Sequence, residues 1–562
     1  MKKIFTFLSF FFLSSASYAQ TTYGEVYTIL QTNCATANCH NNLDQAGALD
    51  LEGLGATLAD KQNNVHAGVF KATPANSFAA AKDNYTVYPG DPYRSFLFRK
   101  ISDGFSDDNP LDSNEGTAHN ANTSSLSDYE KEVIRQWIVY GANSGGDDVD
   151  LNLIADFYTN GGVESVPAAI APPADGEGFQ IHLGPYFIAP GAEVEYLSKY
   201  ETLLDQNTEI IKFQTEMGTF SHHYIVYNYT DQASGGIDPS IVPYGLRTNI
   251  GFDGKSFVLT EQYSNTLETP EGTAFKWGPN TVLDLNSHYI NYSSTQVLKC
   301  EVYLNVYTQD NGTAAQVMLS QLIPNTDIPI PNNGQDVTFI YPYDLPSNFN
   351  LYIWGAVAHT HQYGKDFNIY RRNMDGSRGP QVYDAGCANG IPGCAIEDYD
   401  YKHLPFRFYE PFLDVNLQEG VIAEATFNND GPIPLDWGLT SDDEMMLFVI
   451  FFTLDTVGIE IYENQDTTSV GIRDQVLNSS AIEFYPNPMN ENSSFELSGV
   501  ENGETQLRII DVTGKVCEQQ TFQHMNHSSL PINASNFDNG IYFYQFLQEG
   551  FLLGNGKFVV NK

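Results

Sequence analysis

Basic residues are scarce in this chain. Its 562 residues include 27 Lys and Arg against 69 Asp and Glu, which gives a formal net charge of −42. A surface this negative repels the phosphates of nucleic acids and the headgroups of anionic lipids. We therefore expect no nucleic-acid partner, and the charge suits a hydrated extracellular surface.

Long apolar runs are also rare. The run at residues 4–13 follows Lys2 and Lys3 and precedes a small-residue stretch that ends at Ala19. This arrangement predicts a secretory signal peptide that is cleaved before Gln20. No later run approaches the roughly 20 apolar residues that cross a bilayer. The sequence near the cleavage point contains no cysteine, which argues against a lipid anchor. We expect an exported mature protein without a transmembrane segment.

Cysteine is sparse as well. Six cysteines are too few for a disulfide scaffold in a chain of this length, so each pair is judged by its spacing. Cys387 and Cys394 enclose a short loop, and we expect them to form a local disulfide. Cys300 and Cys517 are far apart in sequence, and we expect no bond between them.

Cys34 and Cys39 are followed directly by His40 in the sequence CATANCH. Two thiols and a following histidine are the groups of a c-type haem attachment site, although four residues separate these thiols where that motif has two. The thiols would bond covalently to the porphyrin, and His40 would supply an axial nitrogen to the iron. The alternative is a disulfide between Cys34 and Cys39 beside a histidine that binds nothing.

The flanks of this motif favour the haem. Apolar residues at helical spacing precede it in residues 23–30, and Ser127 with Glu130 forms a capping box ahead of a second apolar stripe. Residues 20–145 resemble the small class I cytochrome c domains at the front of large exported bacterial enzymes. The matching positions are Gly90-Asp91-Pro92, Ser95, Leu97, Leu126-Ser127, Trp137-Ile138 and Gly141-Ala142. The resemblance implies a small all-α domain around one covalently attached haem c.

Residues 41–130 contain no methionine, so the thioether ligand that such domains place in this loop is missing. His119 stands seven residues before Leu126, where the family has that methionine. We therefore expect His40 and His119 as axial ligands, with a lower potential than a His/Met haem. A solvated His119 with a vacant or different sixth position is the alternative, and His66 is a weaker candidate for the same role.

Residues 178–455 alternate β-rich runs with Pro, Gly and Asn turns, which predicts antiparallel β-sandwiches. His359 and His361 would share one face of a strand and could bind a single ion together. A methionine sulfur beside them, from Met445, would favour Cu(I) over Zn(II). This pattern predicts a copper site.

A second set of imidazoles lies earlier in the chain. Adjacent His222 and His223 can face one ion only if the strand bends there, which the preceding Gly218 makes plausible. His288 lies on an alternating strand and would complete a site with three nitrogens, suited to copper or zinc.

The order and spacing of these segments resemble the type II copper, ascorbate-dependent monooxygenases, the family of peptidylglycine and dopamine hydroxylases. His-His is followed by His about 65 residues on, by His-x-His about 70 further and by Glu-Met about 85 further still. The resemblance implies two eight-stranded jelly rolls. It assigns a copper on His222, His223 and His288 to electron storage and transfer. It assigns a catalytic copper on His359, His361 and Met445 to O2 binding and C–H hydroxylation, with the attached haem as a one-electron donor.

Four positions depart from that family. Val357 replaces the arginine with which peptide-amidating members hold a carboxylate, and Val449 replaces a tyrosine. A glycine-extended peptide is therefore not the expected substrate. Met446 and Ala425 occupy the places of the two cysteines that form a disulfide next to the metal site in the family. Because both cysteines are replaced, we expect different side-chain packing beside the site and an intact fold.

Residues 464–480 are polar and predict a linker. The segments that follow, among them FYPNP, LRIIDVTGK and NGIYFY, alternate like strands and predict a small β-sandwich. They resemble the type A sorting domain of the type IX secretion route, which implies passage through the periplasm and then release or attachment at the cell surface.

We therefore predict a multidomain chain. It comprises a signal peptide at 1–19, an all-α cytochrome c-like haem domain at 20–147, all-β jelly rolls of a copper monooxygenase at 148–324 and 325–463, a linker at 464–480 and a sorting domain at 481–562.

Three functions fit these features. The first is a secreted copper-dependent monooxygenase that holds two copper ions and one haem c, and uses O2 and a one-electron reductant on a small organic substrate. The second is a non-catalytic surface protein that transfers electrons or binds copper. O2 consumption linked to hydroxylation would separate these two. The third function is glycan hydrolysis by a protein with the same double jelly roll, as in peptide N-glycanases of related architecture. That reaction depends on carboxylates, so the hydrolytic activity would persist in His361→Ala.

Overall fold

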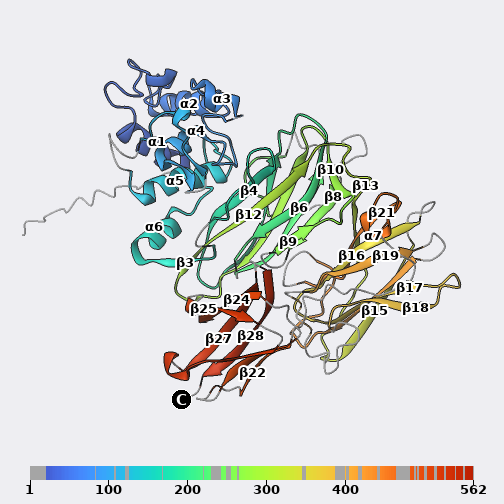
Figure 1. Cartoon of the computed structure of the whole chain (residues 1–562). Helices are drawn as coiled ribbons and strands as arrows, with labels where there is room; N and C mark the ends of the chain where they lie inside the picture. The colour runs from blue at the N-terminus through green and yellow to red at the C-terminus, as the bar shows by residue number, and fades with distance from the viewer. Residues whose placement is uncertain are drawn as a thin grey trace, which may run out of the picture. The chain divides into compact units, whose positions relative to one another are not determined.

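The computed structural model of the chain is mostly β, with helices near its N-terminus (Figure 1). It describes residues 21–82, 84–106, 109–119, 126–166, 169–218, 220–229, 242–248, 255–261, 265–344, 350–386, 399, 401, 404–415, 420–438, 443–463, 481–486, 489, 493–498, 503–511, 516–524, 527–537, 539–548 and 551–560. The predicted signal peptide, the predicted linker and the predicted disulfide between Cys387 and Cys394 lie outside these residues.

The chain divides into two compact units, residues 1–268 with 277–310, and residues 269–276 with 311–562. In the second unit, strand β14 (Leu319–Pro324) pairs along its length with β21 (Leu447–Thr453). Backbone hydrogen bonds therefore tie residues 319–324 to the second unit.

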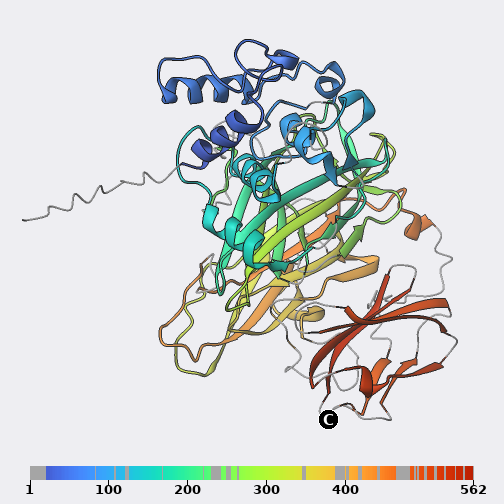
Figure 2. The same cartoon turned by 90° about the vertical axis from the view of Figure 1, so that its left-hand side faces the viewer.

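Six α-helices begin the first unit, and both views show them gathered on one side of its strands (Figures 1 and 2). They are α1 (Thr22–Asn33), α2 (Leu58–Val69), α3 (Ser77–Ala81), α4 (Phe96–Ser102), α5 (Asp128–Val139) and α6 (Leu151–Asn160), with 3-10 turns η1 (Ala46–Ala48) and η2 (Ser113–Glu115). The predicted all-α segment also contains a small two-stranded ribbon of β1 (Gly104–Ser106) and β2 (Asn109–Pro110).

The predicted helical stripes form the core of this helical module. Val26 and Leu30 of α1 are fully buried and pack in one cluster with Val133 and Trp137 of α5. Each such side chain stabilises the fold by roughly 1.5–3 kcal/mol. The expected capping box is present, because the Ser127 side chain accepts from the Glu130 backbone and the Glu130 carboxylate accepts from Ser127.

Two β-sheets follow in the first unit. In one, β12 (Val297–Gln309) pairs with β3 (Gly162–Glu164), β4 (Gly178–Ile188) and β6 (Thr208–Glu216), and β6 pairs with β9 (Asn265–Glu268). In the other, the strand order is β5 (Glu193–Glu201), β11 (Val282–Ile290), β7 (Ser221–Tyr229) and β8 (Lys255–Glu261). The rings of Tyr186 on β4 and Tyr289 on β11 lie 5.8 Å apart, so the two sheets pack face to face.

The second unit repeats this plan with two four-stranded sheets. The strand orders are β14-β21-β16-β19, with β16 (Leu351–His359) and β19 (Arg407–Val415), and β15-β20-β17-β18, with β15 (Asp336–Asp344), β17 (Gly364–Arg372), β18 (Arg378–Asp384) and β20 (Gly420–Asn428). Both sheets supply one apolar core that includes Ala358, Phe448, Phe367 and Ala425. A short parallel pair of β10 (Thr273–Trp277) and β13 (Gln316–Val317) and the single turn α7 (Glu460–Glu463) complete this part.

The C-terminal segment has its own core. Its sheets are β22-β23-β26 and β25-β24-β27-β28, and their shared cluster includes Phe495, Phe546 and Phe558. The strands are β22 (Ala481–Tyr485), β23 (Ser494–Ser498), β24 (Gly503–Asp511), β25 (Val516–His524), β26 (His527–Pro531), β27 (Gly540–Gln548) and β28 (Phe551–Val560), with the 3-10 turn η5 (Ala534–Asn536). Among the described residues, no helix combines the length and the apolar character needed to span a membrane.

Candidate metal centres

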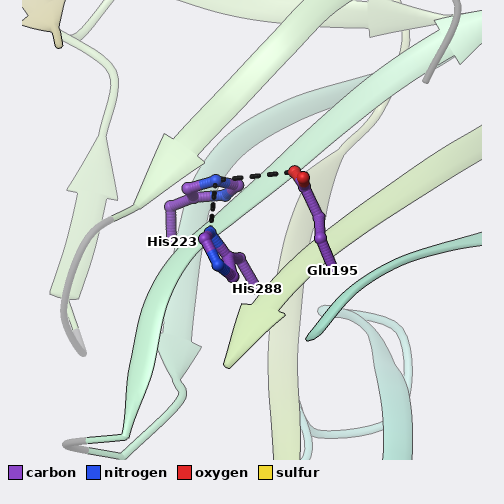
Figure 3. A group of neighbouring side chains, drawn as sticks. All are labelled: Glu195, His223 and His288. Atoms are coloured by element: carbon purple, nitrogen blue, oxygen red, sulfur yellow. Dashed lines mark hydrogen bonds and ion pairs between the residues drawn. The ribbon is translucent and has the colours of Figure 1, made fainter. Parts of the chain in front are cut away.

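Three strands of the first unit bring two histidines and a glutamate together. His288 of β11 pairs with Glu195 of β5 on one side and with His223 of β7 on the other. Directly opposed residues of antiparallel strands share one face of the sheet. The ligand atoms of these three side chains all lie within 4.8 Å of one another, as Figure 3 shows.

The orientation of each ring follows from its partners. Nε2 of His288 lies 2.7 Å from a carboxylate oxygen of Glu193, which can only accept, so Nε2 carries the proton. The lone pair of His288 is then on Nδ1, which faces Nε2 of His223 at 3.3 Å. Nε2 of His223 lies 3.6 Å from Oε1 of Glu195. Both imidazoles are buried, and burial raises the pKa of Glu195, although His288 opposes the shift.

The strand is irregular at the adjacent histidines, as joint coordination requires. His288 pairs with His223, but the next residue of β11, Tyr289, pairs with Ser221. His222 is therefore the extra residue of a β-bulge, which interrupts the alternation of faces along a strand. The side chain of His222 lies outside the described atoms.

In the second unit, strand register relates His359 and His361 to Met445. His359 is the last residue of β16 and pairs with Leu447 of β21. His361 stands two residues after His359 and Met445 two residues before Leu447, and the Glu444 carboxylate accepts from the backbone N–H groups of both His361 and Met445. The two imidazole rings are 5.3 Å apart and perpendicular. His361 lies just beyond the strand that was expected to hold both histidines.

Two methionines stand directly before β21. Met446 belongs to the apolar core of the second unit, together with Phe448 and Ile450 of β21. Met445 is also buried, but it is not a member of that core cluster. Met446 is therefore a core residue, and Met445 is the candidate ligand.

Backbone and carboxylate contacts hold the loop of His361 against the segment of Met445. Nδ1 of His361 lies 3.0 Å from the backbone oxygen of Asp443, which makes Nδ1 the donor and leaves the lone pair of the neutral ring on Nε2. The buried Glu444 accepts from the backbone N–H groups of His361 at 2.9 Å, Tyr363 at 2.6 Å and Met445 at 3.2 Å. Burial raises the pKa of Glu444 to about 7, although these three donors lower it.

The predicted haem ligands also lie near one another. The rings of His40 and His119 are 5.9 Å apart and close to parallel, with 24° between their planes. A metal–nitrogen bond is about 2.0–2.1 Å, so two imidazoles on opposite sides of one ion have ring centres roughly 6 Å apart. Among the described residues, the buried Nδ1 of His40 has no hydrogen-bond partner. This geometry fits a pair of axial ligands.

Both cysteines before His40 are thiols, so the alternative disulfide between Cys34 and Cys39 is not formed. Burial, and then the neighbouring Cys39, raises the pKa of Cys34 to about 11. Burial, and then Lys100 and His40, lowers the pKa of His119, which favours the neutral imidazole that binds metals.

His66, the weaker haem candidate, lies in a different cluster. Its Nε2 is 2.7 Å from the backbone oxygen of Ala142, and its ring packs on Tyr23, Phe70 and Trp137. Through these contacts His66 links α2 to the residues that follow α5.

Sequence reasoning missed three carboxylates and one histidine. Glu193 and Glu195 alternate on β5 and so share a face, but only the pairing with β11 shows that they meet His288. Glu444 stands beside Met445 in the sequence, but the sequence does not show that its carboxylate accepts from three backbone N–H groups. His182 is buried against Glu301, at 2.8 Å, in a stretch without any motif.

The substituted positions lie close to the second site. Val357 and Val449, which replace an arginine and a tyrosine of the resembled family, are buried cross-strand partners on β16 and β21. Their parity puts them on the face of His359. Met446 and Ala425, at the places of the family disulfide, both lie in the intact apolar core. Within the described part of the chain, no disulfide joins Cys300 to Cys517.

Comparison with known proteins identifies one segment. Residues 483–561 match the family model of a secretion system C-terminal sorting domain. The chain is therefore exported by the type IX route and is secreted or held at the cell surface. This match covers the C-terminal segment of the chain.

The other comparisons assign nothing further. No curated protein matches the chain significantly. A structure described as the STIV MCP is 8% identical, covers 52% of this chain and 100% of its own, and has a TM-score of 0.23. A biofilm-associated protein, BSP domain, is 10% identical, covers 65% and 81% respectively, and has a TM-score of 0.13. Similarity this low supports no inference about the fold.

Proposed function

We propose that this protein is an exported copper-dependent monooxygenase that hydroxylates a C–H bond of a small organic substrate. The observation that supports it most is the pairing of His359 with Leu447 together with the Glu444 carboxylate, which accepts from the backbone of both His361 and Met445 and so brings the three candidate ligands into neighbouring segments. Two imidazoles and a thioether are a donor set that favours Cu(I). The sandwiches would be the two jelly rolls of the resembled family, and the helical module would be a cytochrome c-like domain.

The three clusters would hold three groups. His223 and His288, with His222, would hold one copper. His359, His361 and Met445 would hold the other, and Cys34, Cys39, His40 and His119 would hold a haem c. When bound, the copper ions supply the one-electron and O2 chemistry that hydroxylation needs, and the haem supplies single electrons.

The residues around the second site orient its candidate ligands and determine which groups a substrate would meet. The backbone oxygen of Asp443 fixes the His361 ring, and Glu444 fixes the backbone on both sides of it. Val357 and Val449 are buried on the same face of the sheet as His359 and offer no charge to a carboxylate. The substrate is therefore expected to be uncharged at the end that enters the site.

The two methionines allow a matched test. Met445→Leu removes the proposed ligand sulfur, whereas Met446→Leu makes the same change in the core, where such a swap costs less than about 1.5 kcal/mol. O2 uptake with ascorbate, and a product heavier by one oxygen atom, should be lost in Met445→Leu and in His361→Ala and kept in Met446→Leu.

Other outcomes would favour the other functions. Haem oxidation without a hydroxylated product would indicate a non-catalytic electron-transfer or copper-binding protein. Release of sugar from a glycoprotein that persists in His361→Ala would indicate a glycan hydrolase. Equal O2 uptake in Met445→Leu and the unmodified protein would contradict the proposed ligand set.

A further inference from the structure

The first metal cluster contains carboxylates that the resembled three-histidine site does not predict. Glu193 and Glu195 occupy alternate positions on β5 and so lie on one face of the sheet. Glu193 meets the Nε2 edge of His288, at 2.7 Å. Glu195 pairs directly with His288 and lies on the side of the cluster where Nε2 of His223 points (Figure 3).

These two carboxylates have different geometry and therefore different roles. Glu193 is at hydrogen-bond distance from a protonated ring nitrogen, so it orients His288 without reaching an ion. Glu195 Oε1 is 3.6 Å from Nε2 of His223, which is too long for a hydrogen bond. Its side chain is 17% exposed against 38% for Glu193, so Glu195 is the more buried of the two.

The distances match the edges of a coordination polyhedron. Metal–nitrogen and metal–oxygen bonds of about 2.0–2.2 Å place two ligands of a tetrahedral ion roughly 3.3 Å apart. The observed separations are 3.3 Å between His288 Nδ1 and His223 Nε2, and 3.6 Å between His223 Nε2 and Glu195 Oε1. Two of the three separations are thus those expected for ligands of one ion, and all three ligand atoms lie within 4.8 Å of one another.

We propose that Glu195 is an oxygen ligand of the first metal site and makes this site selective for divalent ions. The inference rests on the proposed function, because it adds a ligand to one of its two metal sites. A carboxylate is a hard, anionic ligand, and its attraction for a dication is about twice that for a monocation at the same distance. The first site thus prefers Cu(II) or Zn(II) to Cu(I), whereas the thioether of Met445 gives the second site the opposite preference.

Metal titration of the full mature chain tests this proposal. The second site is first removed by Met445→Leu with His361→Ala, and Cu(II), Zn(II) and Cu(I) are titrated as the bare ions against competing chelators. Glu195→Gln keeps the shape of the side chain and removes its charge. We expect it to weaken Cu(II) and Zn(II) binding by at least about tenfold, to weaken Cu(I) binding less, and to change the Cu(II) EPR spectrum.

Two further variants make the outcome interpretable. Glu193→Gln leaves Glu195 and the histidine ligands unchanged, so its EPR spectrum should keep the hyperfine pattern of the unmodified site. His288→Ala should abolish binding of all three ions.

Unchanged Cu(II) affinity and an unchanged spectrum in Glu195→Gln, together with loss of binding in His288→Ala, would overturn the role of Glu195 and leave the metal site intact. Equal weakening of Cu(I) and Cu(II) would overturn the selectivity. Full Cu(II) binding in His288→Ala would overturn the metal site itself.

Discussion

Glu444 joins two segments that are distant in sequence. Its carboxylate accepts from backbone N–H groups of His361 and Tyr363, after β16, and from its own neighbour Met445, before β21. Charge-assisted hydrogen bonds of this kind are among the stronger ones in proteins. Glu444 therefore fixes the distance between the loop of His361 and the segment of Met445.

We predict that Glu444→Gln weakens Cu(I) binding at the second site by about 10- to 100-fold, the usual effect of losing a residue that orients ligands. An amide has one acceptor oxygen where the carboxylate has two, and its NH2 group would face a backbone donor. Competition with a Cu(I) chelator measures the affinity.

Asp443→Asn is the matched control. It removes the same charge one residue away and keeps the backbone oxygen that accepts from His361, so Cu(I) affinity should stay within about threefold, a free-energy change of under 1 kcal/mol. Equal losses of Cu(I) affinity in both variants would mean that the affinity depends on negative charge and not on the position of the carboxylate. Unchanged Cu(I) affinity in Glu444→Gln would refute the positioning role of Glu444.

At the scale of elements, the sequence predicted what local periodicity determines. The helical stripe that includes Val26 and Leu30 and the capping box at Ser127 are confirmed, because helix spacing and caps depend on residues a few positions apart. Glu195 was missed because its neighbour His288 is 93 residues away in sequence, and only the order of strands β5, β11 and β7 brings the two together. Cross-strand neighbours of this kind leave no local pattern.

One contact between elements of the first unit is dominated by a single carboxylate. Glu201, at the end of β5, accepts from the hydroxyl of Tyr88 in the helical module at 2.5 Å and from Tyr244 at 2.8 Å. Lys71 and Lys199 lie 3.7 Å and 3.8 Å from it. Burial raises the pKa of Glu201, but the hydroxyls and the lysines outweigh burial, and the pKa lies below its ordinary value.

Because folding lowers the pKa of Glu201, the stability of the first unit should depend on pH. A carboxyl group whose pKa is lowered by folding contributes stability above its unfolded pKa of about 4.3, and this stability is lost as the pH falls through the folded value. We predict that Glu201→Gln destabilises the first unit by about 1–2 kcal/mol at pH 7. The difference should narrow below about pH 4, where the native carboxyl also becomes neutral.

Calorimetric unfolding of both proteins at pH 7 and in acid measures this difference. Glu164→Gln is the control, because Glu164 makes one ion pair with Lys299 and its side chain is 40% exposed. Its effect should be under about 1 kcal/mol at either pH. A Glu201→Gln deficit that persists unchanged in acid would show that side-chain packing, and not charge, accounts for it.

For the whole molecule, the sorting domain is the part with a known assignment, and its structure explains why it can act on its own. Phe495, Phe546 and Phe558 lie in one apolar core shared by its two sheets. A segment with its own core can fold without help from the rest of the chain. Export should therefore depend on residues 481–562 and not on the metal sites.

We predict that removal of residues 481–562 leaves the protein in the periplasm of a host with the type IX system, whereas the double variant His361→Ala, Met445→Leu reaches the medium or the cell surface as the full chain does. Immunoblots of periplasm, cell surface and medium measure the distribution. Because the double variant still contains the intact C-terminal core, its retention in the periplasm would show that export requires a folded metal site in addition to the sorting domain. Normal export of the truncated chain would contradict the role of the sorting domain in this protein.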